Sequence, residues 1–191
     1  LRNFKRCTIM LRNTQVHSWL KGTYKATQVQ ENEWGRAIVK NVRPDLEVSK
    51  MWTGMFGQIL IQEIFPNGWR PKCMNGHQPD WETPEFIIEV KSQSWFTPGT
   101  AGEKILGVPV KYRNVPTLYG KPLRIVLFGR AESIWFGIQK DSALEKITEF
   151  WKTMGIEYVK GSELVPPLSA PLDSLNELHD VQKPDVPLET P

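Results

Sequence analysis

Residues 77–91 decide the fold, and they read His77-Gln78-Pro79-Asp80-Trp81-Glu82-Thr83-Pro84-Glu85-Phe86-Ile87-Ile88-Glu89-Val90-Lys91. Side chains alternate between the two faces of a β-strand, so Phe86, Ile88 and Val90 would share a buried face. Glu89 and Lys91 would then share the opposite face, about 7 Å apart. The turn-forming residues before this strand predict a hairpin that folds Asp80 back beside Glu89.

This hairpin would place two carboxylates and a lysine within reach of one another. Carboxylate oxygens are hard ligands that suit Mg²⁺, which also takes water and phosphate oxygens. Lys91 would orient or deprotonate an attacking water and offset the charge that develops on a phosphate. The alternative interpretation is structural: Pro79-Asp80 forms a loop, and Glu89 and Lys91 form a surface ion pair.

The same residues resemble the active-site motif of the PD-(D/E)XK nuclease superfamily. Pro79-Asp80 matches its first half and Glu89-Val90-Lys91 its second, with eight residues between the two acids. Over roughly residues 50–130 the chain looks like the type II restriction endonucleases of that superfamily, including those that large DNA viruses encode. The resemblance implies a restriction-endonuclease-like α/β core, a central mixed sheet flanked by helices. It also implies catalysis by Asp80, Glu89 and Lys91, and Mg²⁺ held by Asp80, Glu89 and the Val90 carbonyl, with Mn²⁺ as a substitute.

An amphipathic helix is predicted over residues 46–65, because apolar residues recur there with a period near 3.6 and Pro66-Asn67-Gly68 ends the pattern. Glu63 lies on the same stripe as Phe56 and Ile59. A carboxylate facing a core is costly unless it is paired or binds metal. Glu63 is therefore either a glutamate at the core boundary or, as the family resemblance implies, a further metal ligand.

Polar and basic residues follow the motif. If the strand continues past Lys91, Gln93 joins its polar face, with Ser94 beside it, and both are candidate DNA contacts. The helix predicted near residues 101–107 would offer its N-terminal amides to phosphate. The basic side chains on and after that helix, Lys104, Lys111 and Arg113, are the first candidates for contacts to bases or phosphates, or else form a solvated face.

Charge is distributed unevenly along the chain. Residues 1–160 hold 23 lysines and arginines against 15 acids, a balance of +8, whereas residues 161–191 hold one lysine and six acids. A basic body is typical of a protein that binds a polyanion. We therefore divide the chain into a basic N-terminal segment packed on the core (1–45), a nuclease core (46–160) and an acidic, proline-rich tail (161–191).

Other classes of protein are disfavoured. The 191 residues contain no apolar run long enough for a membrane span, so we expect no membrane partner. The two cysteines, Cys7 and Cys73, lie far apart and no signal peptide is evident, which favours a reduced, intracellular protein, cytoplasmic or in the host cell if the protein is viral. Cys73 and His77 have no second ligand pair at zinc spacing.

The remaining elements follow from local patterns. We expect a strand or helix around residues 29–42 and strands near 68–73, 77–81 and 85–92. A turn should begin at Val115-Pro116, and a central strand should follow at 123–128. The last elements would be a short strand at 135–139, a helix from about 141 to 154 and a strand at 156–159.

The sequence therefore predicts a metal-dependent endonuclease of the type II restriction kind, acting on double-stranded DNA at specific sites. Cutting both strands at a palindrome needs two sites related by a twofold axis, which favours a homodimer. Three alternatives stay open: a structure-selective repair or recombination nuclease, a DNA-binding protein that keeps the fold without cutting, and an α/β domain with no nucleic-acid role.

Overall fold

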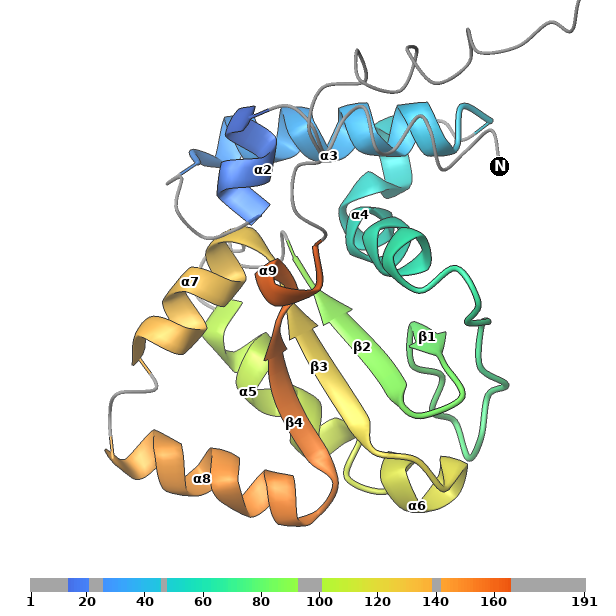
Figure 1. Cartoon of the computed structure of the whole chain (residues 1–191), viewed down its shortest axis with the longest axis vertical. Helices are drawn as coiled ribbons and strands as arrows, with labels where there is room; N and C mark the ends of the chain where they lie inside the picture. The colour runs from blue at the N-terminus through green and yellow to red at the C-terminus, as the bar shows by residue number, and fades with distance from the viewer. Residues whose placement is uncertain (1–13, 21–25, 46–47, 93–100, 139–141, 166–191) are drawn as a thin grey trace, which may run out of the picture.

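The structure is a computed structural model that describes residues 14–20, 26–45, 48–92, 101–138 and 142–165. Within these residues the chain forms a four-stranded mixed sheet flanked by helices (Figure 1). The predicted α/β class with a central mixed sheet is confirmed at this level. The strands, in spatial order, are β1 (Trp81–Glu82), β2 (Ile87–Lys91), β3 (Leu123–Leu127) and β4 (Ile156–Lys160).

The first strand pair is antiparallel and the other two are parallel. In the β1–β2 hairpin Trp81 lies opposite Ile88. Strand β3 is central and apolar, and it pairs in parallel with β2 and with β4 along its whole length. The parallel strands need crossover connections, which the helices between them supply. The helices of the described residues are α2 (Thr14–Leu20), α3 (Gln28–Val42), α4 (Val48–Ile64), α5 (Ala101–Lys111), α6 (Val115–Tyr119), α7 (Gly129–Ile138), α8 (Ser142–Thr153) and α9 (Gly161–Leu164).

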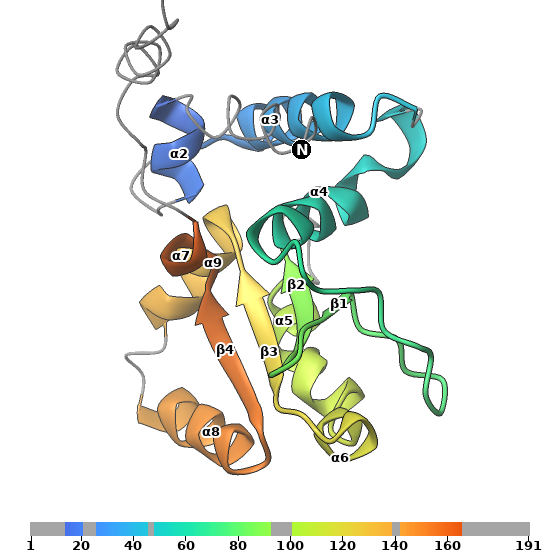
Figure 2. The same cartoon turned by 45° about the vertical axis from the view of Figure 1, so that its right-hand side comes forward.

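The alternation of β2 divides the core into two clusters. Phe86, Ile88 and Val90 pack in one cluster with the apolar side chains of α2, α3 and α4. Ile87 packs in the other cluster with β3, β4 and the apolar side chains of α5 and α7. Figures 1 and 2 show α3 across one end of the molecule and α5 behind the sheet. The prediction that Phe86, Ile88 and Val90 share one buried face is confirmed.

A buried carboxylate joins α2, α3 and α7. The Trp19 indole Nε1–H donates to Glu31 Oε1 at 2.7 Å, and the Arg130 backbone N–H donates to the same oxygen at 3.1 Å. Glu31 has no exposed surface. Burial raises the pKa of the Glu31 carboxyl from 4.5 to about 7, although both hydrogen bonds favour the charged form.

A proline inside α5 links that helix to β4. Pro109 has no N–H to donate to the carbonyl of Ile105, four residues earlier. The Tyr158 hydroxyl of β4 donates to that carbonyl instead, at 2.9 Å. A helix break is thus avoided because a side chain from the neighbouring strand replaces the missing backbone donor.

Three predicted strands are wrong or displaced. Residues 135–138 belong to α7, where Ala131 and Trp135, four residues apart, are buried on one helical face. Residues 68–80 form only the isolated bridges Trp69–Glu82 and Met74–His77, and β1 begins at Trp81. Prolines at 71 and 79 cannot donate to a ladder, which limits strand formation there.

The other predictions agree better with the structure. Helix α4 and strands β2, β3 and β4 lie where the sequence placed them, and α8 matches the helix predicted from residue 141. The ambiguous region around 29–42 is a helix, whose N-terminus has a capping box made by Thr27 and Gln30. The turn expected at Val115-Pro116 opens the short helix α6, because proline is favoured in a first helical turn.

Candidate active site

The β1–β2 hairpin brings Asp80 to the motif strand. Thr83 closes the turn: its backbone N–H donates to the Phe86 carbonyl, and its hydroxyl accepts from the Phe86 N–H. The Asp80 N–H then donates to the Ile88 carbonyl at 3.0 Å. The predicted return of Asp80 to the neighbourhood of Glu89 is therefore present in the structure.

Both oxygens of the Asp80 carboxylate accept a hydrogen bond. Oδ2 accepts from the Val90 N–H at 2.8 Å, and Oδ1 accepts from Gln58 Nε2 at 2.7 Å. Gln58 comes from α4 and was not predicted. A signal for it exists, since Gln58 is the polar residue within the otherwise apolar run from Met55 to Ile61. Two donors from different elements fix the side chain of Asp80 in one orientation.

Glu89 and Lys91 point to the opposite face from Val90, toward α5. Lys91 Nζ lies 2.5 Å from Glu89 Oε1, and the Glu89 side chain is only 6% exposed. Burial raises the pKa of the Glu89 carboxyl, and the negative charge of Asp80 raises it further, while Lys91 acts in the opposite direction. The two carboxylates are therefore close enough to repel each other.

A pocket of about 340 Å³ opens between this face of β2 and α5. Four of the predicted site residues line it: Glu89, Lys91, Lys104 and Lys111. The other lining residues are Glu103, Gly107 and Val108 of α5. The pocket therefore joins the acid and lysine of the motif to two of the three basic residues predicted to contact DNA.

The remaining predicted DNA contacts do not line this pocket. Arg113 is exposed after the end of α5, and its guanidinium Nη1 donates to the Val110 carbonyl at 2.9 Å. Gln93 and Ser94 lie outside the described residues.

Tyr112 is a further member of the site that sequence reasoning missed. Its side chain is 3% exposed, and its hydroxyl accepts a hydrogen bond from Lys111 Nζ at 3.0 Å. Burial raises the pKa of the Tyr112 phenol, and the negative charges of Glu89 and Asp80 add to that rise. The His77 ring meets the Tyr112 ring edge-on, with 5.8 Å between their centroids. Tyr112 thus connects the carboxylates to the segment that precedes Asp80.

Glu63 is not brought to the two carboxylates. Its helix α4 covers the face of the sheet opposite to Glu89, and no contact found in residues 48–92 joins Glu63 to Asp80 or Glu89. Partial burial raises the pKa of the Glu63 carboxyl. Among the described residues, no group of three or more His, Cys, Asp or Glu side chains is placed to hold a metal ion. A metal role for Glu63 stays a prediction without a supporting contact.

The oxygen atoms of Asp80, Glu89 and Val90 are of the kind that binds a hard divalent cation. A carboxylate has about four lone-pair positions, so Asp80 keeps acceptor capacity beyond its two hydrogen bonds. Alternate residues of a strand direct their backbone groups to opposite sides, and those of Ile87 and Lys91 pair with the β3 segment. The Val90 carbonyl therefore lies on the Asp80 side of β2, like its N–H. Carboxylate and carbonyl oxygens are the ligand types that Mg²⁺ takes, and a cation between the two acids would lower the repulsion between them.

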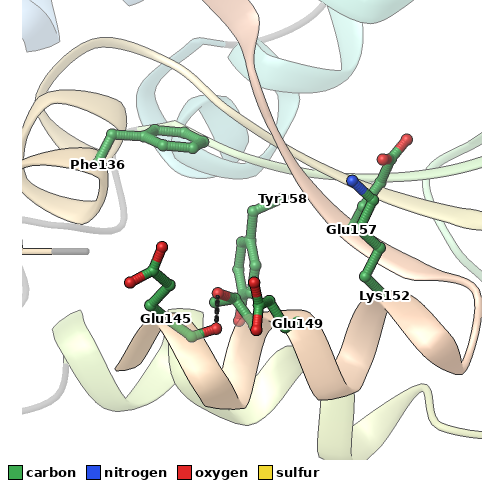
Figure 3. A pocket seen from close by; sticks show the side chains of 7 residues that line it. Phe136, Glu145, Glu149, Lys152, Glu157 and Tyr158 are labelled. Carbon is green, nitrogen blue, oxygen red and sulfur yellow. Dashed lines mark hydrogen bonds between the residues drawn. The ribbon is translucent and has the colours of Figure 1, made fainter. Parts of the chain in front are cut away.

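A second pocket, of about 230 Å³, lies between α8 and β4 (Figure 3). Its lining residues are Phe136, Glu145, Thr148, Glu149, Lys152, Glu157 and Tyr158. Glu157 accepts a hydrogen bond from Arg124 Nε at 2.8 Å, and Tyr158 is the residue that supports α5. None of the predicted site residues lines this pocket, and Thr148 donates to the Glu145 carbonyl at 2.8 Å.

Comparisons with known proteins found no relative. No protein-family model, no curated protein and no solved structure matches the chain. Within the described residues, no helix is both long and apolar enough to cross a membrane.

Proposed function

We propose that this protein is a Mg²⁺-dependent endonuclease that hydrolyses phosphodiester bonds of double-stranded DNA, on a restriction-endonuclease-like core. One observation carries the proposal. The hairpin places Asp80 beside Glu89-Val90-Lys91, and Glu89 and Lys91 line a pocket together with Lys104 and Lys111. A surface ion pair would need neither a buried glutamate nor a neighbouring carboxylate held by two separate donors.

Each residue of the cluster has a distinct task in this proposal. Bound Mg²⁺ would supply a Lewis acid that polarises the scissile phosphate and lowers the pKa of a water. Asp80 and Glu89 present oxygen ligands, with the Val90 carbonyl beside them. Lys91 orients the attacking water and opposes the charge on the phosphate. The water oxygen bonds to phosphorus and gives up a proton to solvent, the P–O3′ bond breaks and the 3′ oxygen takes up a proton from solvent, which leaves 5′-phosphate and 3′-hydroxyl ends.

The surroundings of the pocket support a polyanionic substrate. Lys104 and Lys111 lie on α5 at the edge of the pocket, where they would contact phosphates adjacent to the cleaved bond. Site-specific cutting of both strands would require two copies related by a twofold axis, so we propose a homodimer. Mn²⁺ would substitute for Mg²⁺ because it also accepts oxygen ligands.

The test is cleavage of supercoiled plasmid and linear phage DNA by the full-length protein, with Mg²⁺, Mn²⁺ or EDTA. The informative variant is Lys91→Ala, and the matched control is Lys146→Ala, which removes an exposed lysine of α8 outside the pocket. We expect discrete, metal-dependent fragments from the wild type and the control. Cleavage by Lys91→Ala should fall by about 100-fold or more, while duplex binding in Ca²⁺ persists.

Wild-type rates in the Lys91→Ala protein would refute the assigned roles. Binding without cleavage in either metal would favour a DNA-binding protein that keeps the fold. Cleavage confined to branched or flapped substrates would favour a structure-selective nuclease, and absence of both binding and cleavage would overturn the proposal.

A further inference from the structure

The segment between α4 and β1 forms a narrow arm, which we define as residues 69–79. Figure 2 shows this segment standing out from the body beside β1. At its base the backbones of Trp69 and Glu82 exchange two hydrogen bonds of 2.9 Å. At its tip Met74 and His77 exchange two more, also of 2.9 Å. Asn75 and Gly76 between them have φ values of 49° and 77°, as a tight two-residue hairpin turn requires.

Side-chain contacts hold the arm in this shape. The hydroxyl of Tyr119 in α6 lies 2.5 Å from the Lys72 carbonyl and 3.0 Å from the His77 carbonyl, so it meets both strands of the arm. Gln78 Nε2 donates across the arm to the Pro71 carbonyl at 3.0 Å. At the base Lys121 Nζ lies 5.0 Å from the centre of the Trp69 ring. Contacts with the body and contacts within the arm therefore both hold its shape.

The arm leaves the body beside the candidate active site. Its last residue, Pro79, directly precedes Asp80. The His77 ring contacts Tyr112, which also lies next to Glu89. A phosphate bound at the carboxylates would consequently lie next to the arm, and the groove that borders this phosphate would face it.

The composition of the arm suits a duplex. Residues 69–79 contain Arg70, Lys72 and His77 and no acidic side chain. Arg70, Lys72 and Asn75 are exposed. Tyr119 contacts the arm at the carbonyls of Lys72 and His77, so residues 73–76 form the end that extends beyond these contacts. The major groove admits a two-stranded ribbon, so a turn of this width can enter it toward the base edges.

We propose that this arm enters the groove next to the scissile phosphate, with Arg70 and Lys72 on the backbone and Asn75 at the base edges. The inference rests on the proposed function, since it takes duplex DNA as the substrate. It assigns recognition to a segment whose two ends the sequence predicts as strands. Phosphate contacts would position the duplex, and the tip would contribute to the choice of sequence.

The first test is duplex binding in Ca²⁺ across a salt series, by fluorescence anisotropy. The test variant is Arg70→Ala with Lys72→Ala, and the control is Lys40→Ala with Lys146→Ala, which removes the same charge from α3 and α8. Each lost phosphate contact lowers the slope of log affinity against log salt by about 0.9, so the arm variant should lose about 2. Its affinity at low salt should fall by roughly 10-fold or more, with the control close to wild type.

The second test replaces the tip side chain while keeping the turn. Asn75→Gly preserves the positive φ, because glycine adopts it freely. We expect the relative rates of cleavage at different sites to change by roughly 5- to 150-fold, as for the loss of a base contact. Unchanged site preference would overturn the placement of the tip in the groove.

The outcomes separate the arm from the nuclease activity. A wild-type salt slope in the Arg70/Lys72 variant, together with normal cleavage, would overturn the arm proposal and leave the proposed function standing. Absence of duplex binding by the wild-type protein would instead overturn the proposed function and the arm with it. Near-ultraviolet circular dichroism of each variant checks that the exposed substitutions leave the fold intact.

Discussion

Replacement of Glu31 by glutamine should change how the stability of the protein depends on pH. The Glu31 carboxyl has no exposed surface, and burial raises its pKa from 4.5 to about 7. Below pH 4.5 the group is protonated in both the folded and the unfolded chain, so no buried charge lowers the unfolding free energy. Above pH 7 it is ionised in both, and the folded chain must hold a buried charge. Glu31 therefore contributes stability at low pH that is lost as pH rises through about 7.

The size of the effect follows from the pKa difference. At 1.36 kcal/mol per pKa unit, a rise from 4.5 to about 7 corresponds to about 3 kcal/mol of unfolding free energy. Glutamine stays neutral and keeps a carbonyl that can accept from Trp19 and Arg130. Relative to wild type, Glu31→Gln should therefore gain about 3 kcal/mol between pH 4.5 and pH 8.

Urea unfolding followed by tryptophan fluorescence at several pH values measures this difference. Other buried carboxyls, such as Glu89 and Glu132, titrate in both proteins and cancel in the comparison. Glu33→Gln on the same helix is the matched control, because Glu33 is exposed and its charge remains in water. A constant difference between Glu31→Gln and wild type at all pH values would refute the assignment of a buried, raised-pKa carboxyl.

Two further predictions concern contacts between elements. Gln58→Leu removes the donor to Asp80 Oδ1 while keeping similar volume, and metal-dependent cleavage should fall roughly 10-fold with a higher Mg²⁺ requirement. A metal titration of cleavage measures this, and an unchanged requirement would show that Val90 alone positions Asp80. Tyr158→Phe leaves the Ile105 carbonyl beside Pro109 without its donor and should cost about 1–3 kcal/mol of unfolding free energy. Equal urea midpoints for Tyr158→Phe and wild type would contradict this role.

The local part of the fold could be predicted from the sequence, because short-range patterns determine it. Alternation of side chains in residues 86–91 predicts β2 and which of its side chains share a face. The mostly apolar run 123–127 predicts the central strand. The hairpin that returns Asp80 follows from the turn-forming residues before β2. By contrast, residues 135–138 are helical, because Ala131 upstream adds a buried position one helical turn before Trp135.

The contacts that the sequence did not reveal join residues far apart in the chain. Gln58 lies 22 residues before Asp80, and Tyr119 lies 42 residues after His77. No local periodicity in the sequence indicates such long-range contacts. Glu63 stood out because a charge on an apolar stripe is unusual, whereas Gln58, a neutral amide in the apolar run from Met55 to Ile61, gives a weaker signal. In the structure it is Gln58 that contacts Asp80, because α4 crosses β2 at that point.

The hydrogen bond from Val90 to Asp80 has a consequence for how the chain can change over generations. Strand β1 pairs with β2 only as far as Ile88, so Val90 lies beyond the end of its neighbour. The Asp80 carboxylate accepts from the Val90 N–H, which a longer β1 would otherwise have paired. This side chain therefore satisfies a donor on an open strand edge. If a lineage lost the proposed cutting activity, we would expect position 80 to keep aspartate or asparagine, because an acceptor there still protects the sheet edge. Lys91 and Glu89 would be expected to change together, because Lys91 pairs with that buried carboxylate.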